Sequence, residues 1–254
     1  MPNPKKEYKH RESLTSEEVQ GMMDKADVLY IGNNYFRLRS KALVGILSRM
    51  GKRRSEIASV LRKDVEVKDD GLIYFTYTIR KKHKKGFFQY LNWLKENDPN
   101  YEDRPLVVLK QEWKEWTKTN KEGYSIKKET RTKRVPIKDK YMKPVLEYLD
   151  YLDSVCPETE YLFPSGIMVF GESYKFLPHK HLSGRQLLNL VQKLNDRCWM
   201  HLFRDFCAGE IARRRGDTLT SVVDVKRTLD LEQQSTAMIY VNRHAIQTLD
   251  YEEE

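Results

Sequence analysis

Apolar residues recur at helical spacing along most of this 254-residue chain, and this pattern constrains the fold more than any other feature. Between residues 35 and 50 the apolar residues predict one helix face, made of Leu38, Ala42, Leu43, Ile46 and Leu47. Gly51 follows where a cap glycine is expected. Thr15 and Glu18 have the spacing of a capping box at an earlier helix start. The same apolar spacing predicts further helices over residues 140–155, 182–194, 200–215, 221–228 and 235–247.

One stretch has a different period. From Gly71 to Arg80 the apolar residues alternate with polar or smaller ones, which predicts a strand. A second strand is expected at 132–137, where Pro136 indicates an edge or a strand end. Taken with the helical spacing elsewhere, this predicts a mainly α fold with a small antiparallel β-sheet, an α+β class.

The residues between these two strands, about 86–126, are expected to be an insertion in the β-hairpin. This segment contains Trp93, Trp113 and Trp116, which a flexible linker rarely holds. We therefore expect one or two short helices in a small packed subdomain, and favour this over an extended DNA-contacting arm. The full expected organisation is a basic tail over 1–13, a domain over 14–248 that carries the insertion, and an acidic tail over 249–254.

Charge and composition narrow the classes of function. The chain has 46 Lys and Arg against 37 Asp and Glu, a net charge of +9, so nucleic acid is the first partner to test. An ordinary basic surface explains that number equally well. The longest apolar stretch, residues 72–79, is far shorter than the roughly 20 residues of a membrane span. Three cysteines without a CxxC pair indicate a reducing, cytoplasmic compartment and no structural zinc.

Four separated features carry potential chemistry. Arg53 precedes a helix start in the segment 51–57, and His201 and Arg204 lie one turn apart on a helix. Arginine and histidine together suit a phosphate, while Tyr240 could attack phosphorus if neighbouring cations lower its pKa. The fourth feature is the cationic run 80–85 at a strand end. Taken singly, the plainer interpretations are favoured: a solvated basic turn around Arg53, a chance HxxR, and a surface tyrosine at 240. The cationic run is typical of either a solvated surface or a contact to a phosphate backbone.

Several catalytic patterns are missing from the sequence. It contains no HExxH, no P-loop and no GxGxxG, and its carboxylates do not cluster as a Mg²⁺ site requires. We therefore expect no metal and no cofactor.

The order of the four features resembles the tyrosine recombinases, the phage-integrase family. In sequence order these are the G-x-R-x-S-E-I segment around Arg53, the basic strand end, HxxR at 201–204 and S-T-x-x-I-Y ending at Tyr240. Weaker similarities are Asp64-Val65, the segment 134–137 and the segment 161–165. The resemblance covers about residues 14–247 and implies the fold of the family's catalytic domain.

The resemblance also implies roles. Arg53 and Arg204 would bind the scissile phosphate, Glu56 would brace Arg53, and His201 would assist proton transfer. Tyr240 would attack phosphorus and form a 3′-phosphotyrosyl link, which a second 5′-hydroxyl resolves without metal or ATP. Lysine at the hairpin would protonate the leaving 5′-oxygen, and Lys82 is our first choice, with Lys81 and Lys84 as alternatives. The expected DNA-contacting residues are Arg80, Lys81, Lys84 and Lys85.

Two departures from the family pattern leave alternatives open. Leu231 stands where the family usually has His or Trp nine residues before the nucleophile, and leucine donates no hydrogen bond. Asp205 replaces the commoner His after Arg204, and such loose motifs are similar to archaeal and archaeal-virus integrases. The family usually has a helical clamp domain before the catalytic domain, and only about thirteen residues are expected before it here. A stand-alone domain, a fragment and half of a split gene are the alternatives that this leaves open.

The implied partners are double-stranded DNA and further copies of the chain, as a dimer or tetramer on DNA, with no membrane. The implied location is the cytoplasm, in association with the nucleoid, and the alternative is a protein encoded by a virus or a mobile element. The leading function is a site-specific recombinase or integrase. The alternatives are a catalytically silent DNA-binding relative that regulates recombination and a type IB topoisomerase-like relaxing enzyme.

Overall fold

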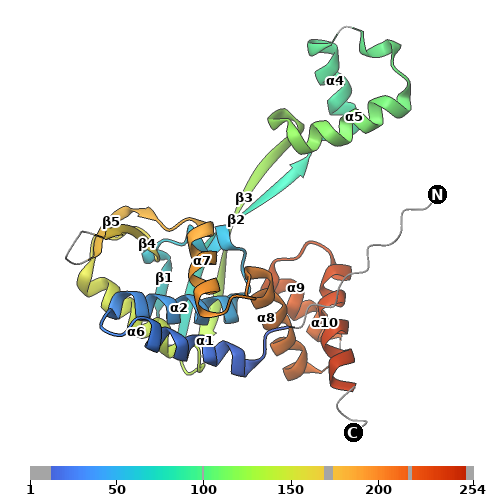
Figure 1. The fold of residues 1–254 in the computed structure, drawn as a ribbon. Helices are drawn as coiled ribbons and strands as arrows, with labels where there is room; N and C mark the ends of the chain where they lie inside the picture. The colour runs from blue at the N-terminus through green and yellow to red at the C-terminus, as the bar shows by residue number, and fades with distance from the viewer. Residues whose placement is uncertain (1–12, 99, 169–173, 217–218, 250–254) are drawn as a thin grey trace. The chain divides into compact units, whose positions relative to one another are not determined.

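The computed structural model describes residues 13–98, 100–168, 174–216 and 219–249, with no side chains described for 245–249. Residues 1–12 of the expected basic tail and 250–254 of the expected acidic tail lie outside the described residues. The chain divides into two compact units (Figure 1). Unit 1 combines residues 1–77 with 132–254, and unit 2 is residues 78–131.

Unit 1 is a helical assembly around α2. Its helix α2 (Asn34–Met50) packs against α6 and α8, and its residues Ala42, Ile46 and Leu47 are fully buried. The other helices of unit 1 are α1 (Ser16–Leu29), α3 (Arg54–Ala58), α6 (Lys143–Val155), α7 (Gly184–Leu194), α8 (Met200–Arg215), α9 (Leu219–Leu229) and α10 (Gln234–Leu249).

Local signals in the sequence explain where these helices begin and end. Thr15 and Glu18 form the expected capping box at α1, with the Glu18 N–H donating to Thr15 Oγ1 at 3.1 Å. Gly51 ends α2 in the left-handed conformation at φ 58°, as the C-cap position requires. Both predictions are therefore confirmed.

A three-stranded sheet lies in the order β1-β2-β3. The strand β1 (Val65–Val67) pairs antiparallel with β2 (Leu72–Lys84), and β2 is also bonded to β3 (Tyr124–Pro136). The alternation seen in the sequence is confirmed, because Ile73, Phe75 and Tyr77 are buried while the residues between them are only partly so. Both β2 and β3 extend well beyond the predicted strands, toward the inserted segment.

A second hairpin, β4 (Pro164–Met168) with β5 (Tyr174–His181), was not predicted. Its strands contain Pro, Gly and Lys rather than alternating apolar residues, so the sequence carries no strand signal there. Non-local aromatic packing accompanies the hairpin instead. Tyr35 of α2 stacks on Tyr174 at 5.0 Å between ring centroids and meets Phe176 edge-on at 4.7 Å.

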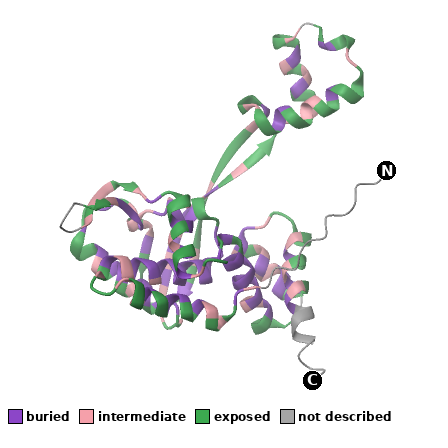
Figure 2. Ribbon diagram, viewed as in Figure 1, coloured by how far each residue is buried: buried purple, intermediate pink, exposed green. Residues whose placement is uncertain are grey.

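Unit 2 has an apolar cluster of its own. The helices α4 (Phe87–Asn97) and α5 (Leu106–Thr119) pack around Tyr90, Leu94 and Trp116, which are buried. Figure 2 shows buried segments on both helices. Trp93 and Trp113 pack against the same cluster. The three tryptophans therefore pack together inside the inserted segment. The segment contains two short helices, α4 and α5. No helix among the described residues is long and apolar enough to cross a membrane.

The C-terminal helix is attached to α8 by a close approach. The His244 ring of α10 is buried and its Nε2 lies 3.0 Å from the Asp205 carbonyl oxygen. A Cβ placed on Gly209 of α8 would lie 2.5 Å from a ring carbon of His244. Only glycine allows the two helices to approach this closely.

We expect Gly209→Ala to destabilise the protein and Gly21→Ala to stabilise it. Both glycines lie inside helices, where alanine is more stable than glycine by about 1 kcal/mol of helix propensity. A Cβ placed on Gly21 has no other atom within 4 Å, so this gain is realised there. At Gly209 the overpacking cost of about 1–3 kcal/mol outweighs that gain. Urea unfolding of both variants measures the difference, and equal stabilisation by the two substitutions would contradict the packing of α10 on α8.

Candidate active site

Arg53 stands at the start of α3 and is held by Glu56. The buried Glu56 carboxylate accepts the Arg53 backbone N–H at 2.8 Å and its Nη1 at 2.9 Å. The Arg53 side chain is still half exposed, at 50%. The guanidinium is therefore oriented at one edge by a buried carboxylate and open at the other, as a phosphate-binding arginine requires.

Arg204 of α8 is buried and bridges two loops. Its Nη1 donates to the Gly51 carbonyl at 2.6 Å and its Nη2 to the Leu229 carbonyl at 2.9 Å. Its Nε is buried and has no hydrogen-bond partner among the described residues. An unsatisfied buried N–H costs roughly 1–3 kcal/mol, so this edge of the guanidinium is suited to an acceptor from outside the chain.

His201 lies one turn before Arg204 and is exposed. Partial burial lowers the pKa of its imidazole, and the nearby Arg204 and Arg53 cations lower that pKa further, against the opposing effect of Asp205. The imidazole is therefore neutral at pH 7 and able to accept a proton.

These three residues converge although they come from segments about 150 positions apart. Arg53, His201 and Arg204 line one cavity of about 340 Å³. Its remaining lining residues are Arg54, Ser55, Leu188, Trp199 and Met200. Leu188 and Trp199 were not predicted as site residues. Leu188 belongs to the apolar pattern of the helix predicted at 182–194, and a single Trp before a helix start has the pattern of an ordinary packing residue.

Tyr240 is not among the residues that line this cavity. It is partly buried on α10 and packs, together with Leu231, against an apolar cluster from α8, α9 and α10 that includes Val225 and Val241. The structure thus brings three of the predicted residues together and places Tyr240 on the adjoining helix layer.

A buried polar network ties the loop before α10 to the loop before Arg53. Lys52 is fully buried, pairs with the Asp230 carboxylate and donates to the Thr228 carbonyl at 2.6 Å. The Tyr77 hydroxyl donates to the same Asp230 carboxylate at 2.9 Å. Asp230 itself has a φ of 51°, a left-handed conformation that is rare outside glycine. The network fixes this strained turn next to Arg53.

The lysine predicted as general acid lies in unit 2. Lys82 Nζ donates to the Lys118 carbonyl at 3.0 Å and lies 3.5 Å from the Tyr124 ring centroid. Of its basic neighbours, Lys81 is paired with Glu129, whereas Arg80 and Lys84 are exposed. None of the residues that line the 340 Å³ cavity belongs to unit 2.

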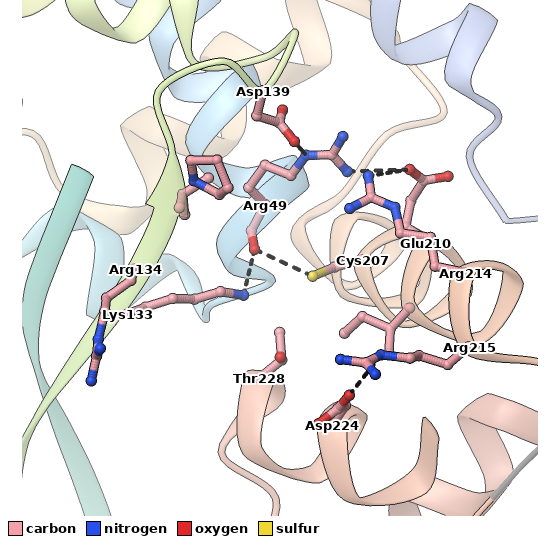
Figure 3. A pocket seen from close by; sticks show the side chains of 13 residues that line it. Arg49, Lys133, Arg134, Asp139, Cys207, Glu210, Arg214, Arg215, Asp224 and Thr228 are labelled. Atoms are coloured by element: carbon pink, nitrogen blue, oxygen red, sulfur yellow. Dashed lines mark hydrogen bonds and ion pairs between the residues drawn. The ribbon is translucent and has the colours of Figure 1, made fainter. Parts of the chain in front are cut away.

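A second pocket of about 430 Å³ lies between β3 and the helices α8 and α9 (Figure 3). The ammonium of Lys133 and the Sγ of Cys207 both donate to the Arg49 carbonyl, and burial lowers the pKa of Lys133. The Arg49 guanidinium pairs with Asp139 at 2.7 Å and Glu210 at 3.2 Å. The Arg49 and Lys133 head groups are thus already held by partners of the chain, which indicates a structural role. No group of three metal-ligating side chains occurs among the described residues.

We expect burial of Lys52 to make stability rise at alkaline pH. Burial outweighs the attraction of Asp230 and lowers the pKa of Lys52 from 10.5 to about 8. Between these values the unfolded chain holds the proton that the folded chain has released, so the free energy of unfolding increases with pH, by about 3 kcal/mol at most.

The measurement is the free energy of urea unfolding from pH 7.5 to 10 in the wild type and in Lys52→Met. Lys133, whose pKa is also lowered, titrates in both proteins, and the difference between the two curves reports the loss of Lys52. The free energy of unfolding of the wild type should increase relative to that of the variant as the pH rises. Parallel curves would show that burial does not lower the pKa of Lys52.

No sequence profile of a known protein family matches the chain, and no curated protein sequence matches it. Solved structures do match. The XerA recombinase aligns with 96% of this chain and 66% of its own, at 15% identity and a TM-score of 0.54. The XerH site-specific recombinase bound to its palindromic difH substrate after cleavage aligns with 94% of this chain and 52% of its own, at 14% identity and a TM-score of 0.55.

The chain thus spans between about half and two thirds of the length of these structures. At such low identity the similarity concerns the fold. The fold of this chain is that of the tyrosine recombinase catalytic domain.

Proposed function

We propose that the chain is a site-specific DNA recombinase or integrase, which breaks and rejoins DNA strands through a 3′-phosphotyrosyl intermediate. The observation that carries this proposal is the convergence of Arg53, His201 and Arg204 on one cavity, in a chain with the recombinase fold. Two guanidiniums and a neutral imidazole around a cavity suit a phosphodiester and the charge that develops on it.

In the proposed reaction, Tyr240 Oη attacks phosphorus and loses its proton to His201. The new bond joins Tyr240 to the 3′-phosphate, the P–O5′ bond breaks, and the leaving 5′-oxygen takes a proton from Lys82. Arg53 and Arg204 stabilise the charge on the non-bridging oxygens. A 5′-hydroxyl of a second strand then attacks the same phosphorus and releases Tyr240, so the bond energy is conserved without ATP or metal.

Tyr240 reaches this phosphate in the assembled protein–DNA complex. The proposed partners are duplex DNA and one or three further copies of the chain, and α10 is the element whose position such an assembly sets. The cationic run 80–85 provides contacts to the DNA backbone. The proposed location of the protein is its DNA substrate, at the nucleoid or on a mobile element.

We expect Tyr240→Phe to abolish covalent capture of DNA. The probe is a suicide duplex with a nick beside the cleavage site, and the adduct is read as a band shift that survives denaturation. Tyr151→Phe is the matched control, because Tyr151 is also a partly buried helix tyrosine but lies on α6. An adduct that persists in Tyr240→Phe would contradict the assignment of the nucleophile.

We expect Arg53→Lys to slow cleavage by about 10²–10³-fold, because one planar donor to the developing charge is lost. Its stability should stay near that of the wild type, since the side chain is half exposed. Arg54→Lys, at the next position of the same cavity, is the control. Single-turnover cleavage rates measure the effect, and equal rates for the two variants would remove Arg53 from the phosphate site.

A catalytically silent DNA-binding protein is the second candidate. The placement of Tyr240 outside the cavity and the leucine at position 231 favour it. This candidate gives duplex binding with a steep salt dependence and no adduct from the wild-type chain. Relaxation of supercoiled plasmid without a defined site would instead indicate a topoisomerase-like activity.

A further inference from the structure

Unit 2 holds most of the excess positive charge of the chain. Residues 78–131 contain 14 Lys and Arg and eight Asp and Glu, a net +6, while the whole chain has +9. Within this unit the two strands β2 and β3 contribute residues 78–84 and 124–131, which we call the basic ribbon. In the basic ribbon the charged side chains are held at regular positions along two paired strands.

Side chains of a strand alternate between two faces, so the ribbon has an even-numbered and an odd-numbered face. Two contacts confirm that this numbering holds across both strands. Lys81 pairs with Glu129 at 3.1 Å, and Lys82 lies over the Tyr124 ring. Odd-numbered residues of β2 therefore lie on the same face as odd-numbered residues of β3, and even-numbered residues share the other face.

The cations of the odd face are paired with one acid, Glu129. This one carboxylate pairs with Lys81 at 3.1 Å, Lys127 at 3.8 Å and Arg131 at 3.1 Å. Hydrogen bonds from Lys81 and Arg131 lower the pKa of Glu129, so it stays charged. The cations of the odd face are thus already gathered around an acid of the ribbon itself.

The even face carries cations and no acid. Arg80, Lys82, Lys84 and Lys128 are all exposed there, together with the exposed side chain of Ile126. Lys82 is engaged by the Lys118 carbonyl. For the other three, no hydrogen bond or ion pair is recorded within the described part of the chain. A surface that leaves three guanidinium or ammonium groups without a counter-charge is suited to a polyanion.

We propose that the even face of the basic ribbon binds the phosphate backbone of duplex DNA, with the ribbon lying along a groove. This proposal rests on the proposed function for the presence of DNA, and it assigns a contact to residues that do not line the cavity of Arg53. It also divides the basic run, because Arg80 and Lys84 belong to the DNA face while Lys81 belongs to the paired face.

Duplex geometry favours this partner. The major groove admits a two-stranded β-ribbon. Alternate residues of a strand stand about 6.8 Å apart, so the cations of the even face are spaced widely enough to reach separate phosphates of the DNA backbone.

The test is the salt dependence of binding to a fluorescent duplex of random sequence, with the full chain. The variant Arg80→Gln, Lys84→Gln, Lys128→Gln removes the three unpaired cations of the even face and leaves Lys82 in place. The matched control, Lys110→Gln, Lys114→Gln, Lys121→Gln, removes three exposed lysines of the same unit away from the ribbon. Thermal unfolding checks that both proteins are folded.

The slope of log affinity against log salt should fall by about 2–3 in the even-face variant and by less than about 1 in the control. Equal losses in the two variants, or an unchanged slope in the even-face variant, overturn the proposal. The same loss of slope with a single strand of the same sequence overturns the assignment to a duplex. Absence of a Tyr240 adduct from the wild type removes the proposed function and leaves this comparison intact.

Discussion

The bridge that Arg204 makes between the Gly51 and Leu229 carbonyls is the interaction on which the candidate site depends. Gly51 ends α2 just before Arg53, and Leu229 ends α9 just before the turn to α10. One buried guanidinium therefore fixes the loop that presents the first arginine and the loop that leads to the tyrosine helix. The pair of Lys52 and Asp230 joins the same two loops a second time. A site built this way is ordered before any ligand arrives, which reduces the entropic cost of binding.

Positive charge has two separate roles in this molecule. In unit 1, Arg49, Lys52 and Arg204 are buried and hold backbone carbonyls or carboxylates, so they contribute to the structure. In unit 2 the unpaired cations lie on an exposed strand face, where they contribute to the field that a polyanion meets. Net charge alone does not separate these roles. The burial and the ion pairs of each cation do separate these roles. Most of the excess positive charge, +6 of +9, lies in unit 2.

The sequence predicted the elements whose signals are local. Periodicity located the helices and the alternating strand β2, and the order of motifs selected Arg53, His201 and Arg204. It did not predict β4 and β5, whose pairing is accompanied by the aromatic packing around Tyr35. Nor did it indicate that Lys52 is buried, because a lysine between a glycine and an arginine looks solvated. The position of Tyr240 depends on how α10 docks on α8 through His244 and Gly209, a contact between residues 35 positions apart.

The most direct test of the account is a crystal structure of the protein with a nicked duplex and orthovanadate, which adopts the geometry of a phosphoryl group in transfer. The account predicts that vanadium bridges Tyr240 Oη and a DNA 5′-oxygen, with Arg53, Arg204 and His201 around its equatorial oxygens. Vanadium and DNA seated away from the cavity of Arg53, His201 and Arg204, for example in the pocket of Lys133 and Arg214, would contradict it.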